Sequence, residues 1–376
     1  MDIYLDNAAT TRVCPEAADI AYKVMTEQYG NPSSTHAKGR EAKKLLDNAR
    51  REISLCLGCQ PKELVFTSCG SEADNWALLS GAYAASAKGG HVISSTAEHD
   101  AVRKSLDELE RRGYEVTRLA PDASGAVPVQ SVVDALRPDT ALVSLMLVNN
   151  ETGAVNDIAG VAKALKKAGS RALLHCDAVQ GFLKVPFTVK SLGADMLTIS
   201  GHKIHAPKGI GALYIRQGLH LRPLVLGGSQ EDGRRAGTEP MPSICAFGEA
   251  ARVGRSLMAE SVKRMAGLRE SAAERLLAEN PGLVVIGGGA PHILCLSLPG
   301  YRSEVLMNFL EARGISVSKS SACKKGGRSH VLEAMGLPAP VIDGALRLGL
   351  SRFTTREELD EFCLCLHEAR ESLAHA

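Results

Sequence analysis

Short apolar runs alternate with amphipathic stretches between residues 64 and 215. Seven of the runs predict β-strands, over 64–67, 91–95, 115–119, 141–148, 172–175, 196–200 and 211–215. Apolar residues at helical spacing predict helices over 72–87, 101–112 and 158–168. Alternating strands and helices are typical of a mostly parallel sheet covered on both faces. In such sheets ligands bind beyond the carboxyl ends of the strands.

The pattern changes near residue 243. A helical periodicity continues to about residue 279, and a strand over 293–298, a helix over 303–313, a strand over 315–318 and a last helix from 356 follow. We therefore expect an α/β fold with a large domain over 14–245, built on a mostly parallel seven-stranded sheet. A smaller α+β domain is expected to combine 1–13 with 246–376.

Composition excludes several classes of protein. The chain has 376 residues, of which 45% are hydrophobic and 23% charged, and a net charge of +2. No block of like charge favours a nucleic-acid partner, and no apolar run is long enough to span a membrane. Ten scattered cysteines and a start without a targeting pattern favour a reduced, cytoplasmic protein. Cys56 and Cys59 lack the second ligand pair of a zinc site, so no metal is expected.

A lysine follows one of the predicted strands within Ser200-Gly-His-Lys203. The amine of Lys203 suits a Schiff base with a phosphate-bearing aldehyde, and Ser200 and His202 suit its phosphate. Asp177 ends another strand, where a carboxylate can keep a pyridine nitrogen protonated. A surface lysine in a glycine-rich turn and an aspartate that caps a helix are the alternative interpretations.

Three further positions suit the same cofactor. Gly70 and Ser71 lie between a strand and a helix, where free backbone N–H groups bind phosphate, although a serine cap without ligand is common. Gln180 follows Asp177 by one short turn and is in reach of a ring hydroxyl. His99 follows a strand, and its imidazole suits both stacking on the ring and proton transfer near neutral pH.

Together these segments resemble the cysteine desulfurases of the class V aminotransferase group, over nearly the whole chain. The shared motifs, in order, are Tyr4-Leu-Asp-Asn-Ala-Ala-Thr-Thr11, Gly30-Asn-Pro-Ser-Ser34 with His36, Phe66-Thr-Ser68, Glu72-x-Asp-Asn75, Glu98-His99, Val148-Asn-Asn-Glu-Thr-Gly153, Asp177-Ala-Val-Gln180, Ser200-Gly-His-Lys203, Arg235-Ala-Gly-Thr238, Ser321-Ala-Cys323 and Arg347-Leu-Gly-Leu-Ser-Arg352. The resemblance implies fold type I and pyridoxal 5'-phosphate as cofactor.

The resemblance also implies a role for each residue. The cofactor would be held by Gly70, Ser71, His99, Asn150, Asp177, Gln180, Ser200, His202 and Lys203 of one subunit and by Thr238 of its neighbour in a homodimer. Asn150 and Arg347 would orient L-cysteine, and Arg347 would grip its carboxylate. Lys203 and His99 would transfer protons. Cys323 would attack the substrate sulfur as a thiolate, leaving alanine and a persulfide for an acceptor protein.

The chain departs from the family pattern in three places. Cys69 stands where the family has glycine, either as a second reactive thiol or as a small packed side chain. His205 and Ala206 replace Tyr and Gly. The segment after Cys323 is shorter and contains Lys324 and Lys325. The acceptor is therefore open among an iron–sulfur scaffold, a tRNA-thiolation protein and a cofactor-synthesis protein.

Two other classes of function compete with this interpretation. A selenocysteine lyase would share the cofactor site and the cysteine, whereas a true aminotransferase would not need Cys323. A non-catalytic sulfur carrier that only keeps the fold is the second class, and a set that includes Lys203, Asp177, His99 and Cys323 argues against it.

Overall fold

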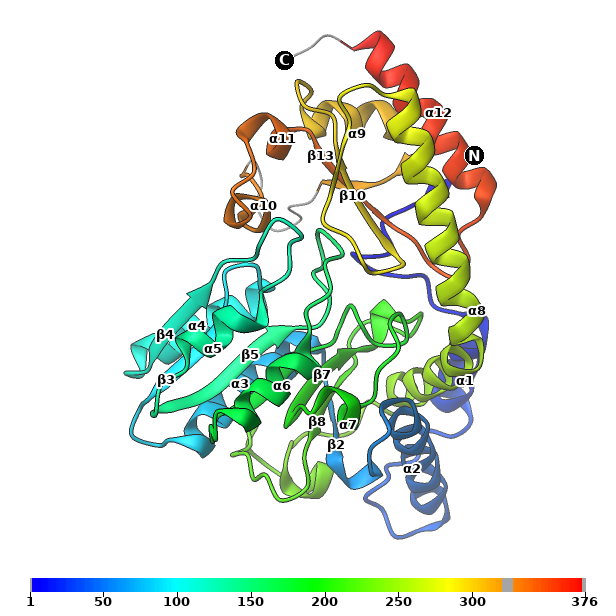
Figure 1. The fold of residues 1–376 in the computed structure, drawn as a ribbon. Helices are drawn as coiled ribbons and strands as arrows, with labels where there is room; N and C mark the ends of the chain where they lie inside the picture. The colour runs from blue at the N-terminus through cyan, green and yellow to red at the C-terminus, as the bar shows by residue number, and fades with distance from the viewer. Residues whose placement is uncertain (1, 320–326, 374–376) are drawn as a thin grey trace.

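The computed structural model describes residues 2–319 and 327–373 (Figure 1). Its larger sheet has seven strands in the order β2-β8-β7-β6-β5-β3-β4. They are β2 (Leu64–Thr67), β3 (His91–Ser95), β4 (Glu115–Leu119), β5 (Thr140–Met146), β6 (Leu173–Asp177), β7 (Met196–Ser200) and β8 (Gly211–Ile215). Strand β8 runs antiparallel to β2 and β7, and the other pairs are parallel. The expected mostly parallel sheet is therefore confirmed.

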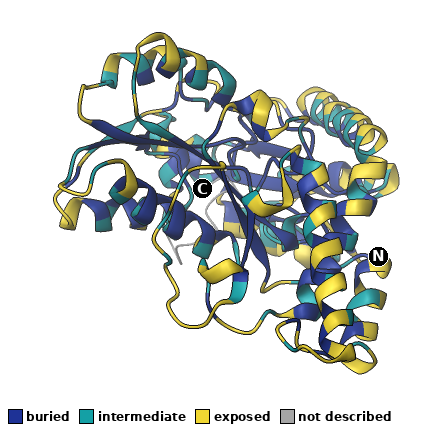
Figure 2. Cartoon of the chain, turned by 90° about the horizontal axis from the view of Figure 1, so that it is seen from below, coloured by how far each residue is buried: buried dark blue, intermediate teal, exposed yellow. Residues whose placement is uncertain are grey.

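Helices cover both faces of this sheet, which explains why its strands are apolar on both sides (Figure 2). On one face α3 (Gly70–Ala85) and α4 (Asp100–Arg111) pack on Val92, Met196 and Leu213. The other face packs, through Leu145, Leu174 and Ile199, on a core shared with α6 (Ile158–Lys167). The connecting helices are α5 (Val129–Ala135), α6 (Ile158–Lys167) and α7 (Val189–Leu192).

A long helix, α8 (Met241–Glu279), joins the two parts of the core (Figure 1). Its first half buries Ile244 and Phe247 beside α1 (Pro15–Thr26) and α2 (Ala37–Leu57). Its second half buries Leu268 and Leu276 in a separate core around the smaller sheet. Helix α8 thus contributes apolar side chains to both hydrophobic cores, to one core from each half of its length.

The smaller sheet is antiparallel and has the order β12-β13-β10-β9. Its strands are β9 (Val284–Ile286), β10 (Ile293–Ser297), β12 (Ser318–Lys319) and β13 (Ala345–Gly349). A parallel pair, β1 (Ile3–Tyr4) with β11 (Ile315–Ser316), ties the N-terminal segment to this part. The surrounding helices are α9 (Ser303–Glu311), α10 (His330–Ala334), α11 (Ala339–Asp343) and α12 (Arg356–Ser372).

One element was predicted wrongly. The single strand expected over 315–318 is two strands in different sheets, because β11 pairs with β1 whereas β12 pairs with β13. The chain changes partner at Val317, between them. The described residues also form the 3-10 turns η1 (Pro61–Glu63), η2 (Gly201–Lys203) and η3 (Gln230–Gly233).

A buried ion pair fixes η3 against the large sheet. Glu231 accepts two hydrogen bonds from Arg50, at 2.7 and 2.8 Å, and one from the backbone N–H of Phe66 at 3.0 Å. Only 2% of the Glu231 side chain and 12% of the Arg50 side chain are exposed. In the part of the chain described, no helix is both long and apolar enough to cross a membrane.

Candidate active site

A cavity of about 330 Å³ lies at the carboxyl ends of β2, β5, β6 and β7. The N-terminal segment and β13 close its other side. The predicted residues that line it are Gly70, Ser71, His99, Asn150, Asp177, Gln180, Ser200, His202, Lys203 and Arg347. Residues far apart in the sequence are therefore gathered at the sheet edge where ligands bind in such folds.

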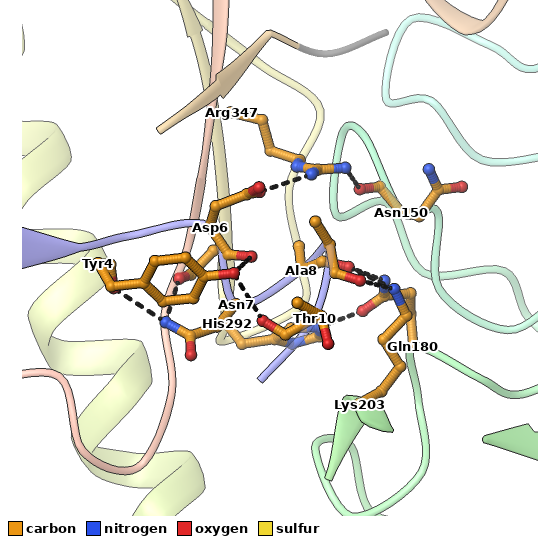
Figure 3. Close-up of polar contacts among 12 residues, drawn as sticks. Tyr4, Asp6, Asn7, Ala8, Thr10, Asn150, Gln180, Lys203, His292 and Arg347 are labelled. Atoms are coloured by element: carbon orange, nitrogen blue, oxygen red, sulfur yellow. Dashed lines mark hydrogen bonds and ion pairs between the residues drawn. The ribbon is translucent and has the colours of Figure 1, made fainter. Parts of the chain in front are cut away.

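Lys203 lies at the end of η2, directly after β7. Its Nζ atom donates hydrogen bonds to the backbone oxygens of Ala8 at 2.8 Å and Ala9 at 2.6 Å (Figure 3). The turn before it requires Gly201, because a Cβ there would lie 2.7 Å from a methyl carbon of Ile210. The N-terminal segment therefore holds the amine at the cavity wall.

Asp177 ends β6 and belongs to a group of three buried carboxyl groups. Burial raises the pKa of Asp177, while the N–H of Val179 and the charges of His99 and Lys203 lower it. Burial also raises the pKa of Asp74 and of Glu98, and the negative charge of Asp177 raises both further. Of the three carboxyl groups, only Asp177 has its pKa lowered by basic side chains. Asp177 is therefore the one of the three in which the negative charge is most favoured.

His99 caps the first turn of α4 with its imidazole. The backbone N–H of Ala101 donates to Nδ1 of His99 at 3.1 Å. Since Nδ1 accepts this bond, the ring carries a proton on Nε2. The cavity is thus lined by an imidazole of defined tautomer, suited to proton transfer.

Another part of the cavity wall suits a phosphate. Helix α3 begins at Gly70, where a Cβ would lie 2.9 Å from a methyl carbon of Val179. The hydroxyl of Ser200 is buried and has no partner among the described residues. Free N–H groups at a helix start and a hydroxyl without a partner are the donors that a phosphate accepts.

Arg347, on β13, crosses from the smaller sheet to the cavity. Its guanidinium donates to the backbone oxygen of Asn150 at 2.9 Å and to a carboxylate oxygen of Asp6 at 2.8 Å (Figure 3). Only 2% of its side chain is exposed. A buried guanidinium held at two points is well placed to bind a carboxylate in the cavity.

These residues fit pyridoxal phosphate. A lysine amine, a buried carboxylate, and an unpartnered hydroxyl beside a helix start match its aldehyde, ring nitrogen and phosphate. Asp177 and Lys203 would hold the ring and the aldehyde carbon. Ser200, Gly70 and Ser71 would hold the phosphate. In the described part of the chain, no group of His, Cys, Asp and Glu side chains is arranged to hold a metal ion.

One predicted residue of the described part does not line the cavity, and a second lies outside the described residues. Thr238 is exposed on the segment after η3 and does not line the cavity of its own chain. Cys323 lies outside the described residues. Of the departures from the family pattern, Cys69 lines the cavity and also caps α3, because its sulfur accepts from the N–H of Glu72 at 3.4 Å. His205 lies beside Arg12 and Phe353 instead, outside this cavity.

Sequence reasoning gave no role to several residues at the site. The carbonyl oxygens of Ala8 and Ala9 carry no sequence signature, although they belong to the first of the shared motifs. Asp74 and Glu98 lie within shared motifs, and their burial became visible only in the structure. Asp6, in the first motif, was likewise not expected to contact Arg347.

The comparisons with known proteins agree with this geometry. The family model "Aminotransferase class-V" matches residues 3–362. "Cysteine desulfurase 2" of Trichormus variabilis is 43% identical over 364 residues, which are 96% of this chain and 90% of the relative. A solved structure titled "NIFS-LIKE PROTEIN" has a TM-score of 0.93 and 35% identity and covers 99% of this chain and 100% of its own.

A second solved structure, titled "SspA in complex with cysteine", has a TM-score of 0.81 and 32% identity. It covers 94% of this chain and 100% of its own chain. Both the family model and the relative thus extend over nearly all of the sequence. The chain therefore belongs to the class-V aminotransferase family, and within it to the cysteine desulfurases, which depend on pyridoxal phosphate.

Proposed function

We propose that the protein removes sulfur from free L-cysteine, releases L-alanine and holds the sulfur as a persulfide on Cys323. The observation that carries this proposal is the single cavity that gathers Lys203, Asp177, His99 and Arg347. The relatives named cysteine desulfurases support the reaction, and the structure of SspA with cysteine supports the substrate.

When bound, pyridoxal phosphate supplies an electron sink that stabilises negative charge at the substrate α-carbon. The carboxylate of Asp177 would keep the ring nitrogen protonated. The positive charge of that nitrogen would in turn favour the ionised form of the buried Asp177. Asn150 and Arg347 orient the substrate, with the guanidinium on the carboxylate. Lys203 would accept the α-proton and later release it. His99, through Nε2, would act as a second acid–base group in these proton transfers.

The sulfur transfer is a displacement at the substrate sulfur. The thiolate of Cys323 attacks that sulfur, a new S–S bond forms, and the electron pair of the broken C–S bond goes to the β-carbon. Protonation of this carbon completes the methyl group of alanine. The overall exchange is cysteine plus enzyme thiol to alanine plus enzyme persulfide, and it needs no further oxidant or reductant.

Three statements about assembly belong to the same proposal. The chain forms a homodimer in which Thr238 reaches the cofactor of the partner, supported by its exposure and by its place outside its own cavity. The large domain comprises residues 14–245, and the small domain comprises 1–13 and 246–376. The separate cores on α8 support a division into two domains, and the first core continues along α8 to Ala251. A sulfur-acceptor protein takes the persulfide.

The test is an assay of the purified protein with L-cysteine and a reductant, following sulfide, alanine and the visible spectrum. Lys203→Ala is expected to lose the visible band of the attached cofactor, and Cys323→Ala to lose sulfide release while it still binds cofactor. Lys190→Ala and Cys59→Ala, at positions away from the cavity, are the matched controls. Wild-type turnover by Cys323→Ala would refute the persulfide and favour a lyase or an aminotransferase.

A further inference from the structure

The amide of Gln180 is fixed by contacts on both of its ends. Its nitrogen donates to the backbone oxygen of Ala8 at 2.8 Å, and its oxygen lies 3.2 Å from Nε2 of His292 (Figure 3). The Nζ of Lys184 lies 3.5 Å from the same oxygen. Because two donors converge on the oxygen, rotation of the amide would turn its NH₂ group against both of them.

Lys184 is a buried amine with an unusual set of neighbours. It follows Gln180 by one turn and is only 7% exposed. Burial, together with the smaller effect of the positive charges of Lys203 and Arg347, lowers its pKa to about 7. It makes no ion pair with a carboxylate anywhere in residues 2–319 and 327–373. A buried cation among cations is costly, and an anion placed nearby would reduce that cost.

His292 supplies the second donor from just before β10. It is fully buried, and burial lowers its pKa well below the ordinary value, so the ring is neutral. Its Nδ1 has no partner among the described residues, whereas Nε2 faces the oxygen of Gln180. The proton is therefore on Nε2, and His292 donates to the amide.

Gln180 lines the cavity together with Lys203, and one of its two amide N–H groups has no acceptor among the described residues. We propose that Lys184 and His292 are positioning residues that hold this orientation. The free N–H of Gln180 then donates to the ring oxygen of the bound cofactor, and the positive charge of Lys184 favours the anionic form of that oxygen. This inference rests on the proposed function, because it requires pyridoxal phosphate in the cavity.

The experiment is a pH titration of the visible absorption of the holoenzyme. Loss of either an N–H donor or a positive charge makes the anionic ring oxygen less favourable. Lys184→Met and His292→Ala are therefore expected to raise the pH midpoint of the spectral change, by about one pH unit for the lysine variant. Lys184→Arg and His292→Gln keep a donor and are expected to restore the wild-type midpoint. Lys190→Met, at an exposed position, is the matched control.

The other titrating groups near Lys184 are Lys203, Arg347, His202 and His205, and each variant retains all of them. Unchanged midpoints in both Lys184→Met and His292→Ala would overturn the inference, as would equal shifts in Lys184→Arg and Lys184→Met. If either Lys184→Met or His292→Ala fails to fold, the midpoint of the remaining one is compared with that of its conservative variant, Lys184→Arg or His292→Gln, and this comparison tests the inference.

The two proposals fail in different ways. A wild-type protein that binds no pyridoxal phosphate, or that releases no alanine from L-cysteine, would refute the proposed function. A wild-type protein that does both, beside variants with unmoved midpoints, would refute only the positioning role of Lys184 and His292.

Discussion

Replacing Lys184 with methionine is expected to stabilise the cofactor-free protein near neutral pH. Methionine has nearly the shape of the lysine stem but no charge, so it retains the packing and removes the buried amine. The pKa of Lys184 falls from 10.5 in an exposed setting to about 7 in the fold, chiefly through burial. At neutral pH the amine of Lys184 is protonated in the unfolded chain, whereas the folded protein binds this proton much more weakly.

The size and the sign of the effect follow from that difference. Each pKa unit corresponds to about 1.4 kcal/mol, so at about pH 7 the buried amine costs about 4 kcal/mol of unfolding free energy. Above pH 10.5 neither state holds the proton and the cost vanishes. As the pH falls from 10.5 towards 7, the unfolded chain takes up the proton first and the folded protein loses stability.

The assay is urea-induced unfolding of the cofactor-free wild type and of Lys184→Met, followed by circular dichroism at several pH values. We expect the advantage of the variant to shrink from about 4 kcal/mol at about pH 7 to about 1 kcal/mol at about pH 9.5. Lys190→Met is expected to change little at either pH. A variant that is destabilised equally at both pH values would refute the reasoning, because a charge-independent loss of packing would then dominate.

Three other predictions concern stability and reactivity. Glu231→Ala is expected to lower the free energy of unfolding, measured with urea, by about 3–5 kcal/mol, because it leaves the buried guanidinium of Arg50 without its ion-pair partner. Asp47→Ala, which removes the exposed pair with Lys43, is expected to lower it by less than about 1 kcal/mol. Equal losses in the two variants would contradict this. Burial raises the pKa of Glu151 to about 7, so the contribution of this carboxyl group to the free energy of unfolding is expected to fall by about 3 kcal/mol as pH rises from about 4.5 to 7. Glu151→Gln is expected to remove this contribution from the pH dependence of urea unfolding. Burial raises the pKa of Cys56 to about 12 and of Cys59 to about 11, so peptide mass spectrometry should find both unalkylated after brief iodoacetamide treatment of the native protein at about pH 8; rapid alkylation would contradict it.

The sequence alone determined the elements of the large sheet and the family. Its strands are short apolar runs bounded by turns, and this local pattern depends little on distant residues. The motif residues at the strand ends, such as Asp177 and Lys203, were found because strand, turn and helix follow one another within a few positions. Since parallel strands share one edge, the order of strands and motifs along the chain is enough to predict that these residues gather around a cavity.

Only the tertiary structure decided which distant groups meet at that cavity. Lys203 contacts Ala8 and Ala9 through backbone carbonyls, which every residue possesses and which no sequence pattern distinguishes. His292 meets Gln180 only because β10 packs where it does, and the 315–318 segment divides because two different neighbours are available to its two halves. Contacts between residues more than one hundred positions apart depend on how the two cores pack on α8, and that packing is a property of the whole chain.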